Sequence, residues 1–261
     1  MKRTVCVLLG WALPAGGVAQ GQEKRDIPKK TPGEKNEAVQ ILRQADEAIK
    51  AVKLVKYKGS FEVIGWEKGQ IPSLEGTVII GGGFDRYFEK FRLDLKVREG
   101  ESSEVEEFVV GGNGDKFFLL DPQKNIAYEN TKPTVVGYAN AWVSSLCMAE
   151  FVHPTPFDDE INAEVVELKG TEKVGDEECY VIHVVYSKAR GLETDWYFSK
   201  KDLLPRRADR ITVHKIRGKS VKKLVITDLI VDPKIDKDTF ELALPEGFEK
   251  TDKSAPWRRP K

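Results

Sequence analysis

This sequence lacks the motifs that hold metal ions or activate nucleophiles. Its 261 residues include three histidines and three cysteines. His153, His183 and His214 stand far apart and form neither the H-x-H nor the H-E-x-x-H spacing of metal ligands. The sequence also has no Walker loop for phosphate, no G-x-S-x-G nucleophile elbow and no C-x-x-C pair. It therefore predicts no enzymatic activity, no metal site and no cofactor.

Net charge is absent as well. The 42 lysines and arginines are balanced by 42 aspartates and glutamates. A neutral chain has no extended positive field for nucleic acid, which argues against that class of partner. The stretch 195–207 (DWYFSKKDLLPRR) combines aromatic and basic residues. We interpret it as a β-hairpin in which Trp196 and Phe198 share one face of the first strand.

The apolar run near the N-terminus is too short to cross a bilayer. Residues 5–17 (VCVLLGWALPAGG) fall below the roughly 20 residues that a membrane helix needs. The basic start MKRT and Ala19 in an A-x-A-like position predict a secretory signal peptide over residues 1–19. Cys6 lies inside the run and away from the cut, which excludes a lipidated-cysteine anchor. We expect an exported protein of the periplasm or the extracellular space, without a stable membrane span.

A flexible leader and one amphipathic helix are expected next. Residues 20–33 are polar and broken by proline, which is typical of a flexible segment. Thr31, Pro32 and Glu34 match a T-x-x-E capping box with proline at the first helical position. Apolar residues then recur at helical spacing: Ala38, Ile41, Leu42, Ala45, Ala48, Ile49 and Val52.

Strands joined by short turns make up most of the remaining chain. The segment 91–98 alternates strictly, with Phe91, Leu93, Leu95 and Val97 on one face and charged residues on the other. Such alternation predicts an antiparallel sheet that is covered on one face only. The Asn113-Gly114 pair predicts a tight hairpin between two of these strands.

One segment interrupts the strands and carries no charge between Lys132 and Glu150. Residues 133–152 (PTVVGYANAWVSSLCMAEFV) are apolar nearly all round, so a helix formed by them must be covered on most sides. Two interpretations remain open, a helix packed on the concave face of the sheet and a lid over an apolar cavity. As a lid, the segment would present five side chains to a lipid-like ligand: Tyr138, Trp142, Leu146, Met148 and Phe151.

Two cysteines follow the predicted signal peptide, Cys147 and Cys179. The export route permits disulfides, but a bridge requires Cα atoms within about 7 Å of each other. The sequence leaves both a Cys147–Cys179 disulfide and two free thiols open.

Two stretches resemble a known family. Residues 111–130 (GGNGDKFFLLDPQKNIAYEN) resemble the aromatic D-P hairpin of the periplasmic lipoprotein-sorting carriers, the LolA/LolB-like superfamily. DWYFSKKDLLPRR, paired with a final TFELALPEGF, is similar to the ending of its secreted bacterial relatives. The resemblance implies an α+β, mainly antiparallel fold: an incomplete, half-open barrel of roughly ten strands with an N-terminal helix and a central helical lid. We expect one domain over residues 34–249 and a disordered tail over residues 250–261.

The resemblance also implies a function. It indicates a monomeric, non-enzymatic envelope protein that binds a lipid or the acyl moiety of a lipoprotein in an apolar cavity, lined by the five lid residues and by Trp196 and Phe198. The alternative is a sensing or scaffolding module with the same fold and a filled core. A carrier requires an apolar space of some hundreds of cubic ångströms, whereas a scaffold fills that space with side chains.

Overall fold

A computed structural model describes residues 36–81, 90–100 and 103–256. The predicted signal peptide, the leader and the capping box at Thr31, Pro32 and Glu34 lie outside these residues. Within them, no helix combines the length and the apolar character that crossing a bilayer requires.

The described residues form one large sheet accompanied by short helices. Its strands are β1 (Leu54–Gly65), β2 (Ser73–Gly81), β3 (Lys90–Arg98), β4 (Glu106–Asn113), β5 (Phe117–Asp121), β6 (Ile126–Asn130), β7 (Val165–Val174), β8 (Glu177–Ser187), β9 (Leu192–Ser199), β10 (Pro205–His214), β11 (Gly218–Val231) and β12 (Glu249–Thr251). They lie in the order β12-β6-β5-β4-β3-β2-β1-β11-β10-β9-β8-β7. Every neighbouring pair is antiparallel except β12 with β6. The predicted half-open, antiparallel barrel is confirmed, with twelve strands where roughly ten were expected.

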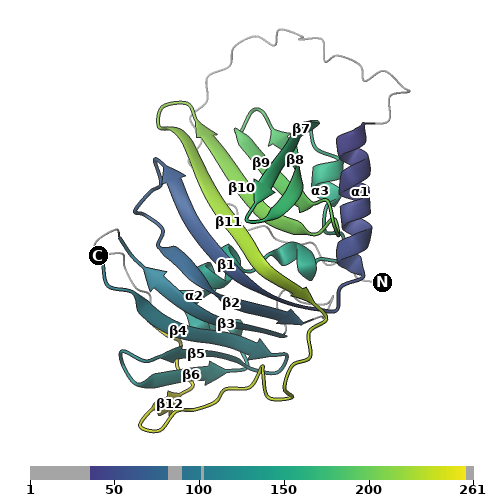
Figure 1. Ribbon diagram of the computed structural model, residues 1–261. Coiled ribbons are helices and arrows are strands. Elements are labelled where there is room, and N and C mark those ends of the chain that lie inside the picture. Colours follow the sequence, from purple (N-terminus) through teal and green to yellow (C-terminus); the bar gives the residue numbers. More distant parts are fainter. Residues whose placement is uncertain (1–35, 82–89, 101–102, 257–261) are drawn as a thin grey trace, which may run out of the picture. The chain divides into compact units, whose positions relative to one another are not determined.

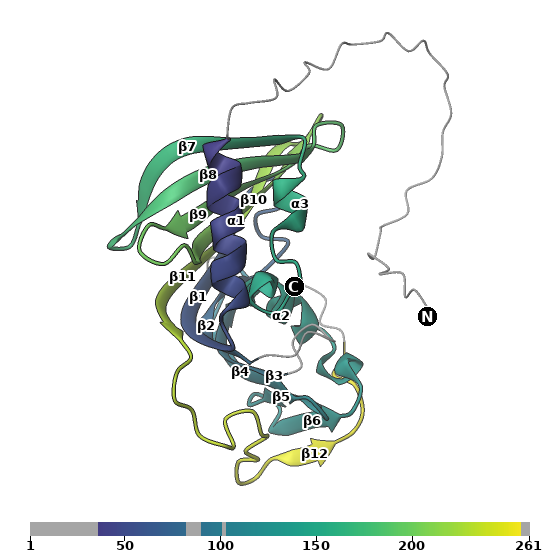
Figure 2. The same cartoon turned by 90° about the vertical axis from the view of Figure 1, so that its right-hand side faces the viewer.

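The sheet curves so that one face is concave, and helices lie on that side (Figures 1 and 2). The first helix, α1 (Glu37–Lys50), packs against β7. It begins after Asn36, whose side chain accepts hydrogen bonds from the amides of Ala38 and Val39 and satisfies donors that the first turn leaves unpaired. Its buried stripe contains Ala38, Ile41, Leu42, Ala45 and Ile49, as the helical spacing predicts.

Alternation along the central strands builds the apolar concave face. In β3 the side chains of Phe91, Leu93, Leu95 and Val97 are all buried, as expected, while the residues between them stay in contact with solvent. β1 follows the same rule, and its inward Gly59 leaves room for a helix. A Cβ atom at Gly59 would lie 3.0 Å from Cδ2 of Leu146, so glycine permits the close approach of the helical segment.

Both predicted hairpins are present. β4 and β5 are joined through Asn113 and Gly114, and Gly114 adopts the positive φ of 99° that favours glycine. The Asn113 side chain accepts hydrogen bonds from the amides of Asp115 and Lys116. β9 and β10 form the second hairpin, in which Trp196 and Phe198 both face the main core.

The C-terminal segment differs from the sequence-based expectation of disorder from residue 250. Glu249–Thr251 forms β12, which pairs in parallel with β6. Beyond it, Ala255 is buried, and its amide donates to the carbonyl of Val135 at 2.9 Å. The order comes from pairing with an available strand edge, which the composition of the tail does not reveal.

The two cysteines are free thiols, so the possible disulfide is not formed. Cys147 lies in the core on the concave side of the sheet. Cys179 belongs to a separate cluster with Val174, Val181 and Tyr197. Because side chains alternate along β8, Cys179 and Val181 face away from the main core. The sheet itself therefore separates the two sulfur atoms.

Candidate functional site

The apolar segment 133–152, in which Glu150 is the one charged residue, lies on the concave face of the sheet, and we call it the helical cover. It is not one helix but a series of short ones: η1 (Pro133–Val136), α2 (Ala139–Leu146) and η2 (Ala149–Phe151). Gly137 separates the first two with φ 51° and ψ −120°, a conformation that suits glycine alone. Cys147 and Met148 are extended and separate the last two. A fourth short helix, α3 (Asp158–Ile161), follows the cover.

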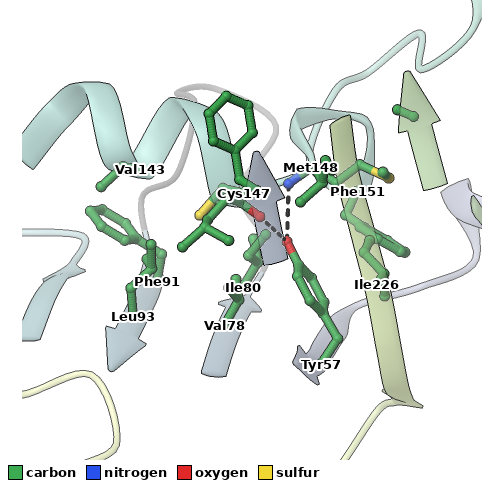
Figure 3. Close-up of a cluster of buried hydrophobic side chains, with 14 of the residues drawn as sticks. Tyr57, Val78, Ile80, Phe91, Leu93, Val143, Cys147, Met148, Phe151 and Ile226 are labelled. Carbon is green, nitrogen blue, oxygen red and sulfur yellow. Dashed lines mark hydrogen bonds between the residues drawn. The ribbon is translucent and has the colours of Figure 1, made fainter. Parts of the chain in front are cut away.

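A tyrosine from the sheet is bonded to the cover at its central break. The hydroxyl of Tyr57 on β1 donates to the carbonyl of Leu146 at 2.9 Å and accepts from the amide of Met148 at 3.0 Å (Figure 3). The extended backbone at Cys147 and Met148 leaves these groups without helical partners, so the tyrosine satisfies both. Burial raises the pKa of Tyr57 well above its usual value, which keeps the hydroxyl protonated and able to donate.

Sequence reasoning missed Tyr57. Its side chain and Leu146 are 89 positions apart, a separation at which no local pattern links them. The available signal was a tyrosine at an inward position of an alternating strand. A phenolic hydroxyl buried there needs a hydrogen-bond partner.

The cover residues predicted to meet a ligand are brought together and buried. Trp142 packs against Phe108 of β4, with ring centroids 4.8 Å apart, and against Tyr138 at 4.9 Å. Leu146 and Met148 have no exposed surface, and the Phe151 ring lies 6.2 Å from that of Tyr57. In the state described, the cover therefore fills the space that a lid over an open cavity would leave.

Trp196 and Phe198 form a second aromatic group in the same core. Their rings stack with centroids 5.9 Å apart, and Phe157, just before α3, packs edge-on against both. The hydrophobic core is continuous, so this group and the cover residues belong to one cluster. Their contact with Phe157 places this group beside the start of α3.

A groove of about 540 Å³ runs along the outer side of the cover. Its lining residues are Pro133, Thr134, Gly137, Asn140, Ala141, Ser254 and Ala255. The C-terminal segment is closely fitted to this side, because a Cβ atom at Gly137 would lie 2.2 Å from the carbonyl oxygen of Ala255. This contact and the Ala255–Val135 hydrogen bond hold the first turn of the cover in place.

A buried polar network lies at the other end of the cover. Glu160 on α3 accepts a hydrogen bond from the hydroxyl of Tyr186 at 2.6 Å, and Tyr186 accepts one from the Trp196 indole at 3.3 Å. The pKa of the Glu160 carboxyl is raised to about 7, mainly by burial; the Tyr186 hydrogen bond opposes this rise and the nearby charge of Glu150 contributes to it. Glu150 in turn lies 3.6 Å from the Arg210 guanidinium. Nowhere in the described residues do three or more potential ligands gather to hold a metal ion.

Comparison with known proteins gives distant structural likenesses. No protein-family model matches the sequence, and no curated protein matches it either. Among solved structures, LprF from Mycobacterium bovis is 12% identical over 76% of this chain and 95% of its own, with a TM-score of 0.46. The Mycobacterium tuberculosis lipoprotein LppX is 11% identical over 76% and 97%, with a TM-score of 0.43.

The superfamily that the sequence resembles is also represented. The LolA superfamily protein NE2245 from Nitrosomonas europaea is 12% identical over 77% of this chain and 96% of its own, with a TM-score of 0.32. At such identities no binding residue and no ligand can be transferred to this chain.

Proposed function

We propose that this chain is a non-enzymatic, monomeric envelope protein that binds the acyl chain of a lipid or lipidated protein. The acyl chain would lie between the concave face of the sheet and the helical cover. The observation that carries the proposal is the construction of the cover itself. A largely apolar segment of very short helices lies on an apolar sheet face, and its central break is hydrogen-bonded to Tyr57.

Beyond its first turn, which the C-terminal segment holds, the cover is suited to movement because its own helices are short and weakly capped. Its longest helix, α2, has eight residues, far fewer than the roughly 12–15 that an isolated helix needs for marginal stability. None of its three helices has a side-chain cap at its N-terminus. The C-terminal segment and the Tyr138–Asp121 hydrogen bond hold its first part. The position of the rest depends mainly on apolar contacts with the concave face and on the hydrogen bonds of Tyr57.

An acyl chain could replace those apolar contacts. Each methylene group that it buries is worth about 0.8 kcal/mol, so a chain of ordinary length offsets the loss of several cover side chains. The hydrogen bonds of Tyr57 must break when the cover moves, and water or the ligand's polar end must then satisfy Leu146 and Met148. The closed arrangement of the cover would compete with acyl binding, so its stability would reduce the apparent affinity.

Export remains part of the proposal and rests on the predicted signal peptide over residues 1–19. The alternative function is a sensing or scaffolding module that keeps the same fold closed. The continuous packing of Trp142, Phe108 and Tyr138 favours that alternative, because it leaves the concave face filled.

Titration with a fluorescent fatty-acyl probe tests the proposal. We expect saturable binding to the wild type. Tyr57→Phe should bind about ten-fold more tightly, because it removes the bonds that hold the cover closed and raises the open fraction. Tyr128→Phe is the matched control, since Tyr128 is also buried but, within the described part of the chain, its hydroxyl makes no hydrogen bond to the cover. If neither the folded wild type nor the folded Tyr57→Phe variant binds the probe, the result would support the filled-core module instead.

A further inference from the structure

Apolar side chains stand in solvent at the end of the β10–β11 hairpin. Ile216, in the turn, is 91% exposed, and Val213 beside it is 44% exposed. The strand register places Ile64, Val221 and Ile211 in one row across β1, β11 and β10. Val213 lies two residues beyond Ile211 on the same face. Ile211 itself is buried, whereas Ile64 and Val213 are exposed, so apolar surface is present at Ile64 and again towards the turn.

The same hairpin carries an unbalanced positive charge. From Arg210 to Ile226 the sequence has six basic residues and no acidic one, although the whole chain is neutral. Those further from the turn are paired: Arg210 with Glu150, Lys222 with Glu67 and Lys223 with Glu62. Nearer the turn the remaining three are Lys215, Arg217 and Lys219, which form no ion pair within the described part of the chain.

The neighbouring β8–β9 turn adds to this charge. The amide of Val213 donates to the carbonyl of Gly191 at 2.9 Å, which fixes that turn beside the hairpin. Lys188 and Arg190 belong to the same turn and are exposed. Figure 1 shows the β10–β11 hairpin extending past the end of β1, so its turn is not covered by that strand. We call residues 188–191 and 213–219 together the basic tip.

We propose that the basic tip docks on the surface of an anionic lipid bilayer, with Ile216 and Val213 entering the headgroup region. Protruding aliphatic side chains surrounded by unpaired basic groups are complementary to a surface that is apolar beneath a layer of phosphate. Each lysine or arginine near such a surface strengthens binding about five-fold, and buried apolar area adds to it. Nucleic acid fits less well, because the protruding side chains are aliphatic and offer no ring for base stacking. The proposal does not depend on acyl binding beneath the cover.

The Arg217 side chain is also placed for this role. Its guanidinium lies 5.1 Å from the centre of the Trp66 ring, at the end of β1. That contact orients the charge without neutralising it. The arginine therefore remains available to a lipid phosphate.

Sedimentation with vesicles tests the proposal, using the processed protein purified from its host. We expect binding to vesicles that contain phosphatidylglycerol and little binding to phosphatidylcholine alone. Replacing Lys215, Arg217 and Lys219 together by Gln should weaken binding about 100-fold. The matched control replaces Lys234, Lys237 and Lys253 by Gln, which changes the net charge equally at exposed positions elsewhere and should have little effect.

Insertion is measured separately. Ile216→Ser should weaken binding several-fold, whereas Leu244→Ser, at another exposed apolar position, should leave it unchanged. The emission of Ile216→Trp should shift to the blue when phosphatidylglycerol vesicles are added. Equal effects of the two triple replacements, equal binding to both vesicle types, or an unshifted emission would overturn the proposal. Circular dichroism confirms that each variant is folded.

Discussion

The hydroxyl of Tyr57 lies 2.9 Å from the carbonyl oxygen of Leu146, and this hydrogen bond joins the sheet to the helical cover in the middle of an apolar core. Hydrogen bonds are few in this apolar core, so each one contributes strongly to the position of the cover. A buried carbonyl or amide that loses its hydrogen-bond partner destabilises the fold, because its desolvation is no longer offset by a hydrogen bond.

Removing this hydroxyl should destabilise the protein measurably. We expect Tyr57→Phe to lower the free energy of unfolding by about 1–3 kcal/mol, because the Leu146 carbonyl and the Met148 amide stay buried without a partner. Urea denaturation measures the change. The control Tyr128→Phe should lower the free energy of unfolding by less than half as much. An equal loss in both variants would contradict the claim that the Tyr57 hydrogen bonds stabilise the cover.

The fit of the C-terminal segment against Gly137 can be tested with a pair of glycine substitutions. Gly137 and Gly175 both have positive φ, 51° and 59°, so alanine is strained at each. A Cβ atom at Gly137 would also meet the Ala255 carbonyl at 2.2 Å, whereas nothing lies within 4 Å of one at Gly175.

Gly175→Ala should therefore cost about 1 kcal/mol from backbone strain alone. Gly137→Ala should cost at least twice as much and should expose the segment around Ala255 to proteolysis. Similar losses and unchanged proteolysis in the two variants would show that the segment is not held there.

The stability of the protein should depend on the protonation of Glu160. Burial raises the pKa of this carboxyl from 4.5 to about 7 in the folded state. Between these pH values the folded protein binds more protons than the unfolded chain, so stability falls as the pH rises from about 4.5 to 7 and then levels off. At about 1.4 kcal/mol per unit, the contribution of this group is at most roughly 3 kcal/mol.

Glu160→Gln should remove that dependence while keeping an acceptor for the Tyr186 hydroxyl. Denaturation curves of both proteins between pH 5 and pH 8 provide the measurement. If the stability of the wild type declines with pH no more steeply than that of Glu160→Gln, the pH dependence does not come from Glu160.

Both cysteines should behave as inert, reduced thiols. Burial raises the pKa of Cys147 above its ordinary value and that of Cys179 to about 11, so neither forms a thiolate near neutral pH. We expect neither to react with a thiol reagent in the native protein, and both to react in denaturant without any reductant. Failure of the denatured, unreduced protein to label would indicate the disulfide that the structure lacks.

The sequence was informative wherever structure is local. The spacing of Ala38, Leu42 and Ala45 predicted the buried side of α1, and Asn113-Gly114 predicted a hairpin. The alternation of Phe91 and Leu93 predicted the concave face of the sheet. Each of these signals repeats over a few residues and is fixed by backbone geometry.

Features that join distant segments could not be predicted in this way. The apolar composition of residues 133–152 predicted burial correctly, but not the extended break at Cys147 and Met148. The bond from Tyr57, the burial of Glu160 and the ordering of Ala255 all depend on the tertiary fold. Trp196 and Phe198 were expected to share a face, and they do, but their contact with Phe157 needed the structure.

Hydrogen exchange at the Met148 amide tests the central claim most directly. This amide is protected in the closed state because it donates to the Tyr57 hydroxyl at 3.0 Å. If an acyl chain enters between cover and sheet, saturating the protein with fatty acid should speed exchange at Met148 by about ten-fold or more, while the amides of β3 stay protected. Fatty acid that binds and leaves Met148 as protected as before would contradict the account, because the chain would then lie somewhere other than beneath the cover.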